Sequence, residues 1–132
     1  MEKTLSINSK IENLRQVEKF IDEISSECKL NSELYGNILI DTLEGANNAI
    51  MHGNKLNEEL LVNIKAKFEN KILEIFIEDQ GKGFDYQNIP DPTAPENIEN
   101  VSGRGVFLMT RLSDNIEFFN NGAVVSLKFK VA

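Results

Sequence analysis

The chain is poor in the residues that hold small proteins together through cross-links or metal ions. Its 132 residues include one cysteine, one histidine and no tryptophan. A single cysteine excludes an internal disulfide, so a reduced, cytoplasmic setting is the expected one. One cysteine and one histidine do not make a zinc site. Any metal should therefore be bound through oxygen, and magnesium brought in with a phosphate ligand is the main candidate.

Long apolar runs and an excess of positive charge are also missing. No run approaches the roughly 20 apolar residues of a membrane-spanning helix, and the N-terminus lacks the apolar stretch of a signal peptide. The net charge of −7 argues against direct binding of nucleic acid, which normally requires a basic face. We expect one domain over residues 1–132, because this length is sufficient to bury a core.

Hydrophobic periodicity predicts an α/β protein. Apolar residues at the i, i+3, i+4 spacing predict three helices, over about 10–30, 32–52 and 103–112. A period of two predicts strands near 5–7, 62–68 and 73–77 and on both sides of Asn121-Gly122, which is a hairpin signal. Because several strands have one apolar face, we expect a two-layer sandwich, with a mixed, largely antiparallel sheet covered on one face by the three helices.

Glycine and proline are concentrated in one region. Two motifs, Asp79-Gln80-Gly81-Lys82-Gly83-Phe84 and Gly103-Arg104-Gly105, contain four of the eight glycines, and all three prolines lie between them. Glycine allows close backbone approach and positive φ, while proline keeps a segment out of helices and strands. The free N–H groups of a helix that begins at residue 103 would form a phosphate cradle, to which Arg104 could add charge. This layout predicts a nucleotide-binding loop.

Asp79 stands at the end of an apolar row. It shares one strand face with Leu73, Ile75 and Ile77, where a carboxylate without a partner is costly to bury. An adenine amino group, a backbone N–H or a lysine could be that partner. In the alternative interpretation, Asp79 only caps the turn that follows the strand.

A stripe of polar residues lies along one face of the second expected helix. Glu44, Asn48 and His52 are spaced by four, and Asp41 flanks Glu44. An amide oxygen that ligates magnesium and a carboxylate that orients or deprotonates a nucleophile suit phosphoryl transfer. The alternative is a solvated helix face. Gly45, at a helix-interior position where glycine costs roughly 1 kcal/mol relative to alanine, favours close packing or a ligand beside the helix.

Together these motifs resemble the GHKL superfamily of ATP-binding domains and, within it, the bacterial anti-sigma-factor serine/threonine-protein kinases. Residues 44–53 resemble the N box of the family, 79–84 its first glycine box and 103–109 its second, and 90–97 resembles a proline-rich lid. The resemblance covers about residues 5–131. It implies that Glu44 is the general base, Asn48 the magnesium ligand and Asp79 the adenine contact. It also implies an ATP lid at about 84–102, with hinges and a phosphate cradle made by Gly81, Gly83, Gly103, Arg104 and Gly105.

The function implied by this resemblance is that of a partner switch. The protein would be a Mg²⁺-ATP-dependent protein-serine kinase that phosphorylates a STAS-domain anti-anti-sigma protein and, when unoccupied, sequesters a sigma factor, usually as a homodimer. Two departures from the family pattern, Gly45 and Ser113-Asp114-Asn115, lie near surfaces that could decide the partner. Ser126 is the nearest match to a threonine that family members place near the adenine, but its parity puts it on the polar strand face.

Two other functions fit parts of the pattern. An ATP-gated interaction module without kinase turnover would use the same nucleotide site, and the presence of Glu44 speaks mildly against it. A stand-alone histidine-kinase ATPase domain would require a separate phospho-acceptor helix pair, for which we find no pattern in these 132 residues.

Overall fold

The computed structural model describes residues 1–81 and 112–131. Part of the expected nucleotide site therefore lies outside the described residues. This holds for the lid expected at about 84–102, for the helix expected from residue 103, and for Gly83, Gly103, Arg104 and Gly105.

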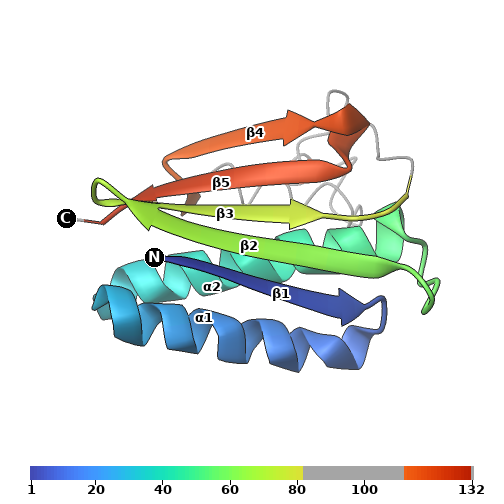
Figure 1. Cartoon of the computed structure of the whole chain (residues 1–132), viewed down its shortest axis with the longest axis horizontal. Coiled ribbons are helices and arrows are strands. Elements are labelled where there is room, and N and C mark those ends of the chain that lie inside the picture. Colours follow the sequence, from blue (N-terminus) through green and yellow to red (C-terminus); the bar gives the residue numbers. More distant parts are fainter. Residues whose placement is uncertain (82–111, 132) are drawn as a thin grey trace, which may run out of the picture.

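In the described part of the chain, five strands form one sheet (Figure 1). They are β1 (Glu2–Asn8), β2 (Leu61–Glu69), β3 (Ile72–Glu78), β4 (Asn115–Phe119) and β5 (Val124–Lys130). The strand order is β1-β2-β3-β5-β4, and each neighbouring pair is antiparallel. The largely antiparallel sheet predicted from the sequence is confirmed, and over residues 1–81 and 112–131 all the pairings are antiparallel.

Two helices, α1 (Leu14–Cys28) and α2 (Ser32–Asn48), lie on one side of the sheet (Figure 1). A 3-10 turn, η1 (Ile11–Asn13), precedes α1. Asn31 caps α2, because its side chain accepts a hydrogen bond from Leu34 N at 2.8 Å. The chain continues from α2 into a π-helical segment, η2 (Ala49–Gly53). The predicted two-layer α/β sandwich is confirmed, and two of its three expected helices fall in the described part of the chain.

The core lies between the sheet and the two helices. The inward-facing residues of β2 and β3 are opposite one another, as in the pairs Ile64–Ile77 and Ala66–Ile75, and they are buried. Complete burial of a side chain of isoleucine size stabilises the fold by about 1.5–3 kcal/mol. The apolar row of β3 that ends at Asp79 is therefore held firmly against α2.

The last two strands form a hairpin, as the sequence predicts. The 3-10 turn η4 (Asn120–Gly122) joins β4 to β5, and Gly122 has a φ of 90°, which favours glycine. The hairpin brings Ala123 next to the end of β3, where Asp79 N donates a hydrogen bond to Ala123 O at 2.9 Å. This contact places the turn after β3 beside the hairpin.

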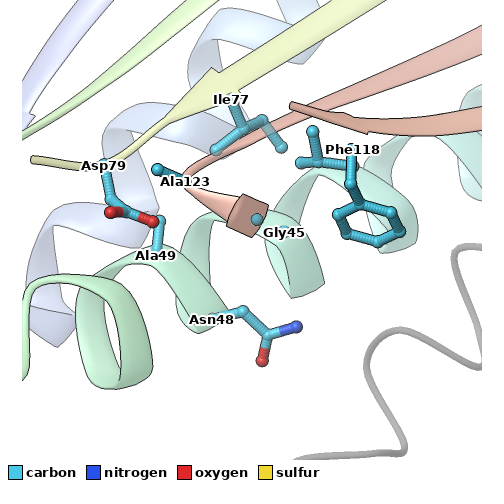
Figure 2. A pocket seen from close by; sticks show the side chains of 9 residues that line it. Gly45, Asn48, Ala49, Ile77, Asp79, Phe118 and Ala123 are labelled. Atoms are coloured by element: carbon cyan, nitrogen blue, oxygen red, sulfur yellow. The ribbon is translucent and has the colours of Figure 1, made fainter. Parts of the chain in front are cut away.

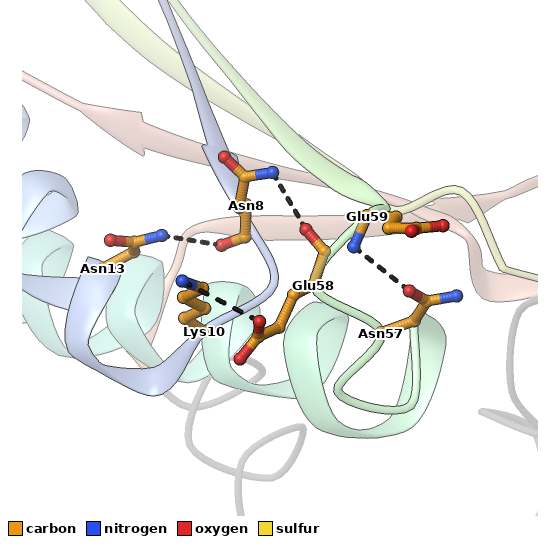
Figure 3. Close-up of polar contacts among 6 residues, drawn as sticks. All are labelled: Asn8, Lys10, Asn13, Asn57, Glu58 and Glu59. Carbon is orange, nitrogen blue, oxygen red and sulfur yellow. Dashed lines mark hydrogen bonds and ion pairs between the residues drawn. The ribbon is translucent and has the colours of Figure 1, made fainter.

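At the far side of the sheet, the end of β1 holds the loop that leads into β2 (Figure 3). Asn8 Nδ2 donates to Glu58 O at 2.9 Å, and Lys10 Nζ lies 3.8 Å from Glu58 Oε2. Within the loop, Glu59 N donates to Asn57 Oδ1 at 3.1 Å. The contacts of Asn8 and Lys10 with Glu58 thereby fix the path of the chain from η2 to β2. Over the described ranges, no helix combines the length and apolar character that crossing a membrane requires.

Candidate nucleotide-binding site

A pocket lies where α2 and η2 meet the end of β3 and the β4–β5 hairpin (Figure 2). Its empty space is about 250 Å³, open solvent included. The residues that line it are Gly45, Asn48, Ala49, Ile77, Asp79, Phe118, Gly122, Ala123 and Val125. Two residues predicted from separate motifs, Asn48 and Asp79, therefore share one pocket. Its walls are otherwise mainly apolar, which suits an apolar part of a ligand.

Asp79 is buried at the end of the apolar row of β3, as its parity predicts. The pKa of its carboxyl group is raised overall. Burial is the main cause, the hydrogen bond from Gly81 N lowers the pKa in part, and the charge of Glu78 raises it further. Gly81 N donates to Oδ1 at 2.9 Å, so Asp79 caps the turn that follows β3. Within residues 1–81 and 112–131 no donor is bonded to Oδ2.

Two glycines enclose this carboxylate at close range. A Cβ atom on Gly53 would overlap Oδ2 of Asp79, and a Cβ atom on Gly81 would overlap the carbonyl oxygen of Gly53. The backbones of η2 and of the turn after β3 are therefore in direct contact. Any side chain at residue 53 or 81 would displace the Asp79 carboxylate or separate the two segments.

The polar stripe of α2 is partly buried rather than solvated. Asn48 is 7% exposed and Glu44, one turn earlier, is half-buried. Asn48 Nδ2 has no hydrogen-bond partner in the described chain. Gly45 is buried and lines the pocket, which agrees with the close packing or ligand that its helix-interior position indicates. The solvated-face alternative is therefore wrong for Asn48.

Asp41 belongs to the same buried side of α2. It is fully buried, and neither carboxylate oxygen has a hydrogen-bond partner among the residues that the structure describes. Burial first, and the charge of Glu44 second, raise the pKa of Asp41 to about 8. Asp41 is therefore mainly a neutral acid at pH 7. Its position beside Glu44 is visible in the sequence, but its burial is not.

The side-chain oxygen of Asn48 on α2 fits magnesium carried by a nucleotide. No group of three or more His, Cys, Asp or Glu side chains that could hold a metal occurs in residues 1–81 and 112–131. Magnesium does not require such a group, because it is commonly bound by one or two protein oxygens together with phosphate oxygens and water. The Asn48 side chain, held at the pocket by α2, can supply one oxygen of this kind.

Several residues at the site have no motif that predicts a role. Phe118, Ala123 and Val125 form the wall that belongs to the hairpin, and only the strand parity of Val125 hints at it. Asn54 in the sequence reads as a helix stop, yet its buried side chain bonds to three other segments. Ser126 faces away from the pocket, as its parity predicts, and its Oγ donates to Glu74 Oε2 at 2.6 Å.

The fold is that of a GHKL-type domain. The chain belongs to the family described as "Histidine kinase-like ATPase domain", whose model matches residues 7–129. Among curated proteins it is similar to the serine-protein kinase RsbW of Staphylococcus epidermidis, including the RsbW of strain RP62A, at 31% identity over 88 residues. The aligned part is 61% of this chain and 55% of those relatives, so the chain spans little more than half of their length.

Among solved structures, the chain is similar to the RsbU and RsbW domains of Rv1364c from Mycobacterium tuberculosis. The TM-score is 0.70 at 14% identity, over 98% of this chain and 32% of that chain. At this level of identity the likeness shows the fold alone, and it agrees with the two-layer sandwich described above.

Proposed function

We propose that this protein is a Mg²⁺-ATP-dependent protein-serine kinase that acts as an anti-sigma regulatory factor. The observation that carries the proposal is the meeting of Asn48 from α2 and Asp79 from the end of β3 in one buried pocket. Membership of the histidine kinase-like ATPase family supports ATP as the ligand. Similarity to relatives named serine-protein kinase supports serine as the acceptor of the phosphoryl group.

In this proposal the adenine ring occupies the apolar end of the pocket. Asp79 Oδ2 accepts a hydrogen bond from the adenine amino group, while Oδ1 stays bonded to Gly81 N. Ile77, Phe118 and Val125 form the apolar surroundings. Recognition by a buried acceptor favours a base that places an amino hydrogen at this carboxylate, because a base that places a carbonyl oxygen there would leave the carboxylate without that hydrogen bond.

The transfer step uses the polar stripe of α2. Glu44 accepts the proton of the serine hydroxyl while the serine oxygen forms a bond to the γ-phosphorus. The bond from that phosphorus to the β–γ bridging oxygen breaks at the same time, and ADP is released. Magnesium, when bound with the nucleotide and ligated by Asn48, supplies neutralisation of the phosphate charge. Gly81 and Gly83 as one hinge, and Gly103, Arg104 and Gly105 as the phosphate cradle, complete the proposed site.

The proposed partners follow from the resemblance to anti-sigma-factor kinases. They are a STAS-domain anti-anti-sigma protein as the phosphorylated substrate and a sigma factor as the sequestered protein, with a homodimer as the working form in the cytoplasm. The net charge of −7 agrees with regulation through proteins rather than through direct binding of nucleic acid.

A nucleotide titration tests the proposed role of Asn48 as the magnesium ligand. ATP affinity is measured by calorimetry with and without magnesium for the wild type, for Asn48→Ala and for Asn47→Ala, a control at the neighbouring, half-buried position of the same helix. We expect magnesium to strengthen ATP binding in the wild type and in Asn47→Ala, but not in Asn48→Ala. An equal magnesium effect in all three proteins would remove Asn48 from the site.

The kinase role is separated from ATP-gated binding by Glu44→Gln. Partners are captured on the immobilised protein from an extract of its native cells, with and without Mg²⁺-ATP, and are then used as substrates for transfer of labelled phosphate. We expect Glu44→Gln to retain ATP binding and to lose phosphate transfer to a captured STAS protein. A variant that transfers phosphate at the wild-type rate would contradict the role of Glu44 as general base. If the wild type transfers none while partner retention depends on nucleotide, the ATP-gated module replaces the kinase.

A further inference from the structure

Asn54, the residue directly after η2, has a side chain at the junction of four chain segments. It is 2% exposed. Its Nδ2 donates to Ser9 Oγ at 2.8 Å and to Leu61 O at 3.0 Å, and its Oδ1 accepts from Gln80 N at 2.8 Å. The end of β1, the start of β2 and the turn after β3 are thus tied to the end of η2 by one amide group, whose two hydrogens are both donated.

The bond to Gln80 concerns the nucleotide pocket directly. Gln80 stands between Asp79, whose carboxylate lines the pocket, and Gly81, whose N–H binds that carboxylate at 2.9 Å. On the other side, the residue before Asn54 is Gly53, which lies against Oδ2 of Asp79. Asn54 therefore fixes the two backbone segments between which the Asp79 carboxylate is held.

Two further bonds make this junction rigid. The Gln80 side chain returns to β2, where its Oε1 accepts from Leu61 N at 2.6 Å. Ser9 is buried, and its Oγ donates to Leu60 O at 2.8 Å. Buried amide groups that are fully bonded keep one geometry, because any rearrangement would leave a donor or an acceptor unpaired.

We propose that Asn54 is a positioning residue of the nucleotide site, which holds the Asp79 carboxylate against Gly53 and so makes the pocket selective for a purine with a 6-amino group. The inference rests on the proposed function, in which Asp79 accepts a hydrogen bond from adenine. Asn54 touches neither the nucleotide nor the transferred phosphate. It acts through the backbone N–H of Gln80.

The test compares two nucleotides that differ at the purine 6-position. ATP carries an amino group there and ITP carries an oxo group, so the ratio of their affinities reports the hydrogen bond to Asp79. Both affinities are measured by calorimetry with the full chain as the wild type, Asp79→Ala, Asn54→Ala and Ser9→Ala. Ser9→Ala is the matched control, because it removes one bond of the same junction and leaves Asn54 bonded to Gln80 N and Leu61 O.

We expect the wild type and Ser9→Ala to prefer ATP over ITP by at least about tenfold, the effect of a hydrogen bond to a charged acceptor. Asp79→Ala and Asn54→Ala should both lose most of this preference. Urea unfolding of each variant shows that the affinities refer to folded protein. If Asn54→Ala does not fold, Asn54→Ser replaces it, since the shorter serine side chain does not reach Gln80 N.

Two results would overturn the inference about Asn54 and leave the proposed function standing. In the first, Asn54→Ala keeps the wild-type ratio while Asp79→Ala loses it. In the second, Asn54→Ala and Ser9→Ala lose the ratio to the same extent, which marks a structural role of the whole junction. If the wild type does not bind ATP, or if Asp79→Ala keeps the preference, the proposed adenine contact is wrong and the inference is overturned with it.

Discussion

Replacing Asp41 with asparagine should stabilise the protein at neutral pH. The side chain is fully buried, and its carboxylate oxygens have no partner in the described residues. Asparagine has nearly the same shape and is uncharged at every pH. Like the neutral acid it also has polar atoms to bury, so the variant isolates the effect of ionisation.

The sign follows from the raised pKa. Burial, together with the charge of Glu44, raises the pKa of Asp41 from 3.8 to about 8 in the folded protein. A group whose pKa is raised on folding contributes its full stability below the pKa of the unfolded chain, near pH 4, and loses it as the pH rises through the folded value near 8. Wild-type stability should therefore fall across this window, whereas asparagine removes the contribution of residue 41 to that fall.

The magnitude follows from the size of the window. Each unit of pKa shift corresponds to about 1.4 kcal/mol, so the roughly three units between the unfolded pKa and pH 7 amount to about 4 kcal/mol. We expect Asp41→Asn to unfold at higher urea concentration at pH 7, and its advantage over the wild type to grow by about 3 kcal/mol from pH 5.5 to pH 8.

Urea unfolding at several pH values between 5.5 and 8 measures both effects. Glu59→Gln is the control, because it makes the same change from carboxylate to amide at an exposed side chain and should leave the profile unchanged. A parallel profile for Asp41→Asn and the wild type would refute the reasoning, since it would show that Asp41 titrates at an ordinary pKa in the folded protein.

Two further predictions concern Gly53, which lies against Asp79, and Ser126, which faces away from the pocket. Gly53→Ala should weaken ATP binding by at least about tenfold, because the new Cβ would displace the Asp79 carboxylate; Gly36→Ala in α2, whose Cβ would meet nothing within 4 Å, should keep the affinity and add about 0.5–1 kcal/mol of stability. Equal affinities in calorimetry would contradict the close contact at Gly53. Ser126→Ala should cost about 1 kcal/mol in urea unfolding through its lost bond to Glu74 and leave ATP affinity unchanged; a drop in affinity would place Ser126 in the site.

Patterns with a regular period predicted the frame of the molecule well. The alternation in 62–68 and 73–77 gave the correct faces of β2 and β3, and continuing it by one step placed Asp79 at the pocket. The turn signal at Asn121-Gly122 located the last hairpin. These features depend on which side of an element is apolar, and this information is local in the sequence.

The features that could not be predicted from the sequence depend mainly on contacts made in the interior of the protein. Periodicity continued the second helix to about residue 52, whereas it changes to a π-helix at Ala49. Asn54 reads as a residue that ends a helix, although its amide joins β1, β2 and the turn after β3. A buried acid such as Asp41 contradicts the binary pattern and could not be inferred from it. Each of these features requires the relative positions of segments far apart in the chain.

The glycine contact between η2 and the turn after β3 also limits how the pocket can be altered. Because backbone meets backbone at Gly53 and Gly81, a side chain introduced at either residue would displace the Asp79 carboxylate or separate the two segments. The part of the pocket formed by Phe118, Ala123 and Val125 on the hairpin, in contrast, does carry side chains. Under the proposed function, variants that accept altered adenine nucleotides should therefore be sought on the hairpin, with Gly53 and Gly81 left unchanged.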